Sequence, residues 1–164
     1  MTSYGARRGG RTYRGGMTLL DAPAPILDNG NPFVRGQIDQ YLATGGAEPV
    51  FRFNAPLLLI TTQGRKSQQW RRTCLIYGPH EDTFVICASL GGAPAHPVWY
   101  LNLLDNPRVW LNVGPDAFWA TAREATETER PALWSMMVSL FPDYADYKEK
   151  TDRVIPLIVL SRER

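Results

Sequence analysis

Two β-hairpins constrain the fold of this chain more than any other feature of its sequence. Residues 72–78 and 83–89 flank the turn sequence PHED, and residues 108–113 and 117–125 flank the turn sequence GPD. All four runs are short and rich in apolar and β-branched residues, and the second pair alternates apolar and other side chains. Hairpins of this kind pair as antiparallel strands, because a short turn can join them without a crossover helix. An antiparallel sheet is therefore the expected framework.

Other segments add strands and helices around these hairpins. Buried strands are predicted at residues 56–63 and 154–161. Because proline has no backbone N–H to donate, Pro156 predicts that part of the second strand is an edge or a bulge. Helices are predicted at residues 31–45, 98–106, 127–141 and 143–153. Asn31 caps the first helix, and Thr126 with Glu129 forms a capping box before the third. The predicted class is α+β, with a small antiparallel barrel of about six strands flanked by helices.

Positive charge is unevenly distributed along the chain. Residues 1–16 contain four arginines and no acid, although the formal net charge of all 164 residues is only +2. This Gly/Arg-rich segment has no apolar periodicity, so it is predicted to be a disordered basic tail. A linker at residues 17–30 and one domain at residues 31–164 are expected to follow, and Met17 is an alternative start. Because the tail resembles RNA-binding Arg-Gly-Gly segments, a nucleic-acid-binding module is an alternative function.

Several classes of chemistry find no support in the sequence. The two cysteines, Cys74 and Cys87, lie in separate apolar runs and form no disulfide framework, so both are expected as free, buried thiols. The two histidines lie in no cluster with cysteines or carboxylates, and no metal site is predicted. The apolar runs are too short to cross a bilayer, and a soluble cytoplasmic protein is expected.

A basic loop is predicted at residues 64–72, GRKSQQWRR, between two strands. It contains no acid and four cations: Arg65, Lys66, Arg71 and Arg72. Arginine side chains form planar forks that match phosphate or carboxylate oxygens, and Ser67 adds a hydroxyl. Trp70 is expected as an exposed aromatic among these charges. The pattern indicates a ligand with several negative charges; the alternative is a solvated turn whose charges serve solubility.

Two further segments could line a ligand site. Gly91 and Gly92 follow a predicted strand and would let backbone amides approach a ligand closely, although paired glycines are also ordinary in turns. Tyr144 and Tyr147 are three residues apart on a predicted helix and would share one face. Such amphipathic aromatics could form the wall of a pocket for a flat ring system.

Separate motifs together resemble one protein family. LLLITTQGRKS, RRTCLIYG, ASLGGAPAHPVWYLNLLDNP and FPDYADYKEKTDRVIPLIVL follow, in order, the pattern of the deazaflavin-dependent nitroreductases and quinone reductases, over residues 33–161. The resemblance implies a split β-barrel and coenzyme F-420, an 8-hydroxy-5-deazaflavin with a ribityl phosphate, lactyl and polyglutamate tail. That acidic tail would be the polyanion that the basic loop binds.

The resemblance also assigns roles to residues. Arg65, Lys66 and Ser67 match the family's phosphate and tail motif, and Arg71 and Arg72 would lie on the same rim. The deazaflavin would lie among a larger set of residues: Thr73, Cys74, Leu75, Ile76, Ala88, Ser89, Gly91, Trp99, Tyr100 and Asn102. Tyr144 and Tyr147 would border the substrate pocket as wall residues or proton donors. Departures from the family pattern include Leu90, where lysine is common, and Cys74, where proline is common.

The expected activity is an F-420-dependent reduction. Reduced F-420 would transfer a hydride to a planar, electron-poor small molecule, such as a quinone, an enone or a nitroaromatic. No nucleic-acid partner is expected on this interpretation. Membrane contact through the first helix and the oligomeric state are left open. A split-barrel protein that binds FMN or haem, or one that carries F-420 without turnover, is the alternative.

Overall fold

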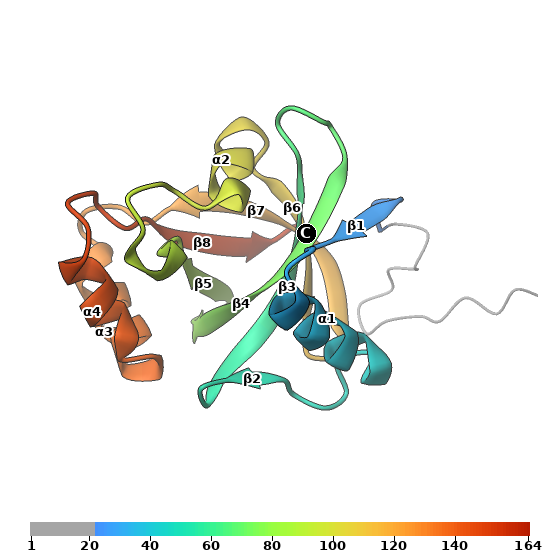
Figure 1. The fold of residues 1–164 in the computed structure, drawn as a ribbon, viewed down its shortest axis with the longest axis horizontal. Coiled ribbons are helices and arrows are strands. Elements are labelled where there is room, and N and C mark those ends of the chain that lie inside the picture. Colours follow the sequence, from blue (N-terminus) through green and yellow to red (C-terminus); the bar gives the residue numbers. More distant parts are fainter. Residues whose placement is uncertain (1–21) are drawn as a thin grey trace, which may run out of the picture.

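The computed structural model describes residues 22–164 (Figure 1). Strands and helices follow one another in this order: β1 (Ile26–Asp28), α1 (Pro32–Thr44), β2 (Phe51–Arg52), β3 (Ala55–Gln63), β4 (Trp70–His80), β5 (Thr83–Cys87), the 3-10 turn η2 (Leu90–Gly92), α2 (Val98–Asp105), β6 (Arg108–Val113), β7 (Asp116–Glu124), α3 (Arg130–Leu140), α4 (Asp143–Glu149) and β8 (Leu157–Arg162). Residues 1–16, the predicted basic tail, lie outside the described part of the chain.

Six strands close into a barrel. Their order is β4-β5-β8-β7-β6-β3, and β3 pairs back to β4. All of these pairings are antiparallel, including the two predicted hairpins β4–β5 and β6–β7. The expected α+β class with a small antiparallel barrel is confirmed, since helices lie around the sheet (Figure 1).

Two apolar cores use opposite faces of the same strands. Side chains from all six barrel strands fill the interior, where Leu58 and Ile60 of β3 are fully buried, and Tyr100 and Leu103 of α2 pack against this cluster. Leu57 and Leu59 point the other way, into a second cluster that α1, α3 and α4 cover. This division follows from the strand period of two, which sends successive side chains to opposite faces.

Helix ends agree with the predicted caps. The side chain of Asn31 accepts hydrogen bonds from the backbone N–H groups of Phe33 and Val34, and α1 ends at Gly45 in the left-handed conformation. Thr126 and Glu129 form the reciprocal bonds of a capping box, with Thr126 N–H donating to the Glu129 carboxylate and Glu129 N–H donating to the Thr126 hydroxyl. Within residues 22–164, no helix is long and apolar enough to cross a membrane.

Some boundaries differ from the sequence-based predictions. Residues 26–28, expected within a linker, form β1 and pair in parallel with β4, whereas β2 is an unpredicted partner of β3. The helix expected to reach residue 153 ends at Glu149. The last strand begins just after Pro156 and pairs on both sides, with β5 and β7, so it is not an edge strand. Pro156 stands before the ladder and therefore removes no donor from it.

Candidate functional site

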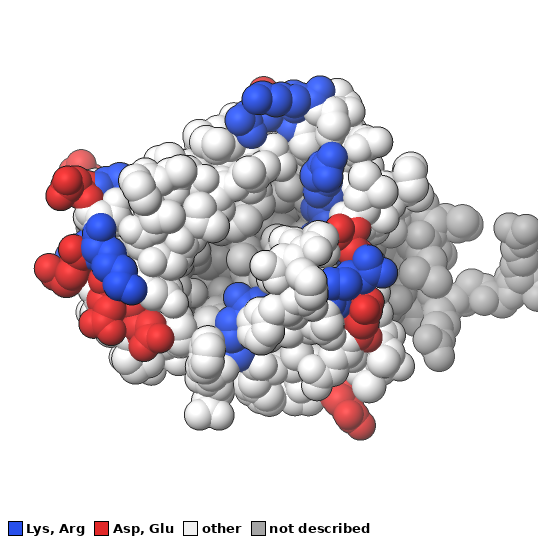
Figure 2. Space-filling model, viewed as in Figure 1, with Lys and Arg blue, Asp and Glu red and all other residues white. Residues whose placement is uncertain are grey.

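A cleft of about 600 Å³ opens on the outer face of the barrel. Its floor includes Cys74 and Ile76 of β4, together with Cys87 of β5. One wall comes from β1, α1 and β2, and the facing wall comes from α4 and from Phe141 just before it. Figure 2 shows the hollow between largely uncharged walls, with Lys and Arg side chains at several points around it. The cleft therefore combines an apolar floor with a positively charged surround.

The predicted basic loop joins β3 to β4 and is tightly closed. Gly64 N–H donates to the Gln69 carbonyl, and Gln68 N–H donates to the Gly64 carbonyl, each at 2.8 Å. Asn102 on α2 fixes the loop to the barrel, because its side-chain oxygen accepts a hydrogen bond from Arg65 N–H at 3.1 Å. The Asn102 amide also donates to the hydroxyl of Thr62 at 3.3 Å. The backbone of the loop is thus held in one place beside α2.

The four cations of this loop have different surroundings. Among residues 22–164, no carboxylate lies within ion-pair distance of Arg65, Lys66 or Arg71, and Arg71 lines the cleft. Arg72 instead forms a two-pronged ion pair with Asp28, at 2.6 and 3.1 Å. Asp28 comes from β1, whose parallel pairing sets it opposite Arg72. The basic loop contains no acid in its own sequence, but the fold places Asp28 beside it. Arg72 is therefore already paired.

Most of the predicted ligand-binding residues line the cleft. These are Arg71, Arg72, Thr73, Cys74, Leu75, Ile76, Ser89, Gly91, Trp99, Asn102, Tyr144 and Tyr147. Arg65, Lys66 and Ser67 belong to the basic loop, whose Arg71 end reaches the cleft. The structure places Ala88 and Tyr100 in the barrel core rather than among the lining residues.

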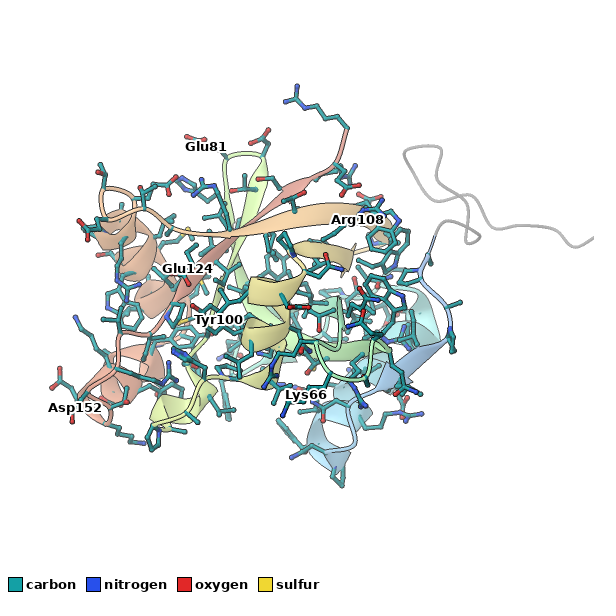
Figure 3. The ribbon with its side chains drawn as sticks, turned by 90° about the horizontal axis from the view of Figure 1, so that it is seen from above. Lys66, Glu81, Tyr100, Arg108, Glu124 and Asp152 are labelled. Atoms are coloured by element: carbon teal, nitrogen blue, oxygen red, sulfur yellow. The ribbon has the colours of Figure 1, made fainter. Side chains whose placement is uncertain are left out.

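Tyr100 faces away from the cleft. Its hydroxyl donates a hydrogen bond to the carboxylate of Glu124, and Figure 3 shows the two residues side by side. Burial and the neighbouring Glu124 carboxylate raise the pKa of Tyr100 to about 12. The expected exposure of Trp70 was also wrong, because its ring packs edge-on against Trp119 at 5.4 Å between ring centroids. Neither side chain is placed to meet a ligand in the cleft.

A tyrosine wall stands on one side of the cleft. Tyr144 is buried and packs edge-on against Phe141, at 5.0 Å between ring centroids. Burial raises the pKa of the Tyr144 and Tyr147 hydroxyls. The ordinary tyrosine pKa of 10 already lies well above neutral pH, so both hydroxyls are protonated there and can donate hydrogen bonds to an oxygen of a bound molecule.

Gly92 allows this wall to stand close to the loop after β5. It has a left-handed φ of 78°, and a Cβ atom added there would lie 2.7 Å from the Tyr147 carbonyl oxygen. Any side chain at this position would push α4 away from the loop. Gly92, one of the two glycines recognised in the sequence, thus sets the position of a wall of the cleft.

The arrangement suits a ligand with a flat ring and an acidic extension. The apolar floor can take an aromatic ring, while the free charges of Arg65, Lys66 and Arg71 can take phosphate or carboxylate oxygens. In the described part of the chain no cluster of His, Cys, Asp and Glu could hold a metal ion. An organic ligand with a polyanionic tail fits these donors.

Comparison with known proteins supports the same conclusion. The family model described as F420H(2)-dependent quinone reductase matches residues 33–162. The chain belongs to this family. A quinone reductase of that description from Mycobacterium tuberculosis strain H37Rv is 40% identical over 110 residues, which cover 65% of this chain and 74% of the relative.

Solved structures show the same fold. An F-420-H2 dependent reductase is 37% identical with a TM-score of 0.61, and the match covers 68% of this chain and 99% of that one. A second structure, described as a domain-swapped dimer, is 36% identical with a TM-score of 0.63, covering 77% and 96% of the two chains. Family membership makes this protein an oxidoreductase with a split β-barrel, coenzyme F-420 as its cofactor and a small-molecule acceptor.

Two arginines of this quinone reductase family member contribute to the site but were not predicted from the sequence. Arg153 donates to the backbone carbonyls of Ala88, Ser89 and Ala93, at 3.2, 2.7 and 2.9 Å, and so holds the loop between β5 and α2. Arg52 of β2 lines the cleft. Neither arginine belongs to a basic cluster like that of residues 64–72, and the contacts of Arg153 span 60 or more positions of the sequence. No local signal in the sequence could have identified either residue.

Proposed function

We propose that this protein transfers a hydride from reduced F-420 to a planar, electron-poor acceptor, with quinones as its main substrates and enones or nitroaromatics as others. One observation carries the proposal. An apolar cleft with a wall of protonated tyrosines is continuous with a basic loop in which three cations have no carboxylate partner among residues 22–164. A flat donor with an acidic tail and a flat acceptor can both be accommodated by such a surface.

The basic loop holds the acidic tail in this proposal. Arg65 and Arg71 bind phosphate or carboxylate oxygens through planar forks, while Lys66 supplies a compact charge and Ser67 a hydroxyl. Arg72 acts differently, because its guanidinium is already bonded to Asp28. It supports the rim and contributes less of its charge to the ligand.

The floor and the loop after β5 hold the ring. Thr73, Cys74, Leu75 and Ile76 lie along β4, and Ser89, Gly91, Trp99 and Asn102 complete this side of the cleft. Apolar contacts exclude water from the reacting atoms, and rigid strand positions fix the ring within near-attack distance of an acceptor, roughly 3 to 3.5 Å. The cofactor, when bound, supplies two-electron hydride chemistry.

Tyr144 and Tyr147 act on the acceptor. Their hydroxyls are protonated at neutral pH, since the ordinary tyrosine pKa of 10 already lies well above it and burial raises the pKa further. A neutral hydroxyl donates a hydrogen bond to an acceptor oxygen, and this bond strengthens as negative charge develops there. Water can then deliver the proton that completes the reduction, so no dedicated acid is required.

The test is turnover. Chemically reduced F-420 is mixed with the protein and with a panel of quinones, enones and nitro compounds, and oxidation of the cofactor is followed by its absorbance. The proposal predicts enzyme-dependent oxidation that is fastest with quinones. Tight binding of F-420 without turnover of any acceptor would support the carrier alternative.

A further inference from the structure

Arg52 lines the cleft but comes from a different part of the fold than the basic loop. It stands on β2, directly opposite Ala55 at the start of β3, whereas the basic loop follows the other end of that strand. Its guanidinium reaches Cys74, with Nη2 at 3.5 Å from the sulfur. Cys74 is three residues along β4 from Arg71, the unpaired loop cation that lines the cleft, which corresponds to about 10 Å at roughly 3.3 Å per residue. A second positive centre therefore lies over the cleft floor.

The guanidinium of Arg52 is held in place by neutral groups. Its Nε donates to the side-chain oxygen of Gln37 at 3.1 Å, and Nη2 donates to the same oxygen. The ring of Phe33 lies 5.4 Å from the guanidinium carbon in a cation–π contact. These contacts fix the orientation of the group but leave its charge uncompensated, in contrast to Arg72, which is paired with Asp28.

No carboxylate among residues 22–164 forms an ion pair with Arg52. No hydrogen-bond partner of its Nη1 is recorded within those residues, so this nitrogen can donate to a ligand. The charge also reaches the facing wall, because it offsets part of the rise that burial causes in the pKa of Tyr144 and Tyr147. A half-buried, oriented and unpaired cation over an apolar floor is suited to bind an anionic oxygen.

We propose that Arg52 binds the acceptor oxygen that becomes negatively charged during reduction, with the acceptor ring lying between Arg52 and the tyrosine wall. This inference rests on the proposed function and adds to it the position and the chemistry of the acceptor. It selects acceptors that carry a carbonyl or an ionised hydroxyl on a flat ring. Gln37 is a positioning residue, since it acts only through the guanidinium.

Arg52 contributes to the reaction by electrostatic stabilisation. The acceptor receives a hydride, its π-bond opens, and the electron pair moves onto the carbonyl oxygen as an oxyanion. The Arg52 guanidinium hydrogen-bonds to that oxyanion, and a proton from water then converts it to a hydroxyl. Reduced F-420, when bound, would supply the two electrons that the acceptor gains, so the reaction balances without another reactant.

The first test measures binding without turnover. Tryptophan quenching gives the Kd of a hydroxynaphthoquinone, whose ring hydroxyl is ionised at neutral pH, and of the parent naphthoquinone. The wild type is expected to prefer the anion by about tenfold, and Arg52→Met to lose that preference. Arg108→Met is the matched control: Arg108 is exposed on β6, pairs with Glu163 and does not line the cleft. It should keep the preference.

The second test uses turnover and cofactor binding together. Arg52→Met is expected to lower kcat/KM for quinones by about 30-fold, while the Kd of F-420 stays within about twofold of the wild type. If Arg52→Met folds poorly, Arg52→Lys is measured in its place. Lysine keeps the charge but lacks the planar fork, so this variant is expected to lower kcat/KM about fivefold. Thermal denaturation of each variant shows whether it is folded.

Three outcomes have distinct meanings. The inference would be overturned if Arg52→Met kept both the preference for the anion and the wild-type kcat/KM. The same holds for Arg52→Lys if Arg52→Met does not fold. A loss of F-420 affinity as large as the loss of turnover would also overturn it, because Arg52 would then belong to the cofactor site. If the wild type failed to oxidise reduced F-420 yet showed an Arg52-dependent anion preference, the proposed function would fail while the oxygen-binding role of Arg52 would stand.

Discussion

The backbone N–H of Arg65 donates a hydrogen bond to the side-chain oxygen of Asn102, at 3.1 Å. Asn102 is almost fully buried on α2 and also donates to Thr62 of β3. Through these two bonds the helix that packs against the barrel core also fixes the basic loop. The position of the loop cations is therefore set by the fold rather than by the loop alone.

Replacing Asn102 should release the loop. Asn102→Leu removes both hydrogen bonds at similar side-chain volume, and is expected to lower the free energy of unfolding by about 1–3 kcal/mol. Because the cations then lose their fixed geometry, the Kd of F-420 should rise by about tenfold. Urea denaturation and fluorescence titration measure the two effects. An unchanged Kd in the folded variant would show that the loop needs no anchor.

Asp28 should limit the affinity for a polyanion. Asp28→Asn removes the negative charge that is paired with Arg72, and so frees one guanidinium beside the cleft. F-420 is expected to bind about threefold more tightly at low salt, and less so at high salt. The variant should also lose about 3 kcal/mol of stability, because a largely buried ion pair is broken. Weaker cofactor binding in this variant would contradict the assignment of Arg72 to the rim.

The two adjacent glycines should differ sharply in their tolerance of a side chain. Gly92→Ala places a methyl group 2.7 Å from the Tyr147 carbonyl oxygen, whereas Cβ at Gly91 meets nothing within 4 Å. Both residues have positive φ, so the backbone cost of about 1 kcal/mol is common to both variants. Thermal denaturation should show a loss for Gly92→Ala that exceeds the loss for Gly91→Ala by about 2 kcal/mol. Equal losses would mean that α4 moves freely.

Low pH should destabilise the N-terminal capping box of α3. The two-pronged hydrogen bond from Arg123 and the bond from Thr126 N–H lower the pKa of Glu129 to about 2, from an ordinary value of 4.5. A carboxylate with a depressed pKa adds stability above its unfolded value, and this contribution is lost as pH falls toward the folded value. The melting temperatures of the wild type and Glu129→Gln should differ at neutral pH and converge between about pH 4.5 and pH 2. A constant difference would contradict the pairing.

Local sequence signals account for much of the fold. The hairpins β4–β5 and β6–β7 could be predicted because each joins consecutive strands through a turn. Ring closure by the β3–β6 and β5–β8 pairs joins distant segments, and no pattern in the sequence specifies those partners. The strand β1 was missed for a similar reason: it has three residues and pairs in parallel with a segment 44 positions away.

The candidate site was predictable where its residues are contiguous. The cations of the basic loop, the paired glycines and the spaced tyrosines each form a short pattern that can be read directly. Asp28, Arg52 and Arg153 reach the site only through tertiary contacts, so their roles could not be predicted. For the same reason the pairing of Arg72 with Asp28 and the packing of the half-buried Trp70 against Trp119 were not foreseen.

The central claim is that the basic loop holds the acidic tail of F-420. Its most direct test compares the Kd of F-420 with that of the same deazaflavin lacking phosphate, lactyl and glutamate groups. The wild type should prefer F-420 by about 100-fold, and Arg65→Ala/Lys66→Ala should reduce this preference to about fivefold. Arg162→Ala/Arg164→Ala, which removes the same charge outside the cleft, should leave it near the wild-type value. An undiminished preference in the loop variant would contradict the account.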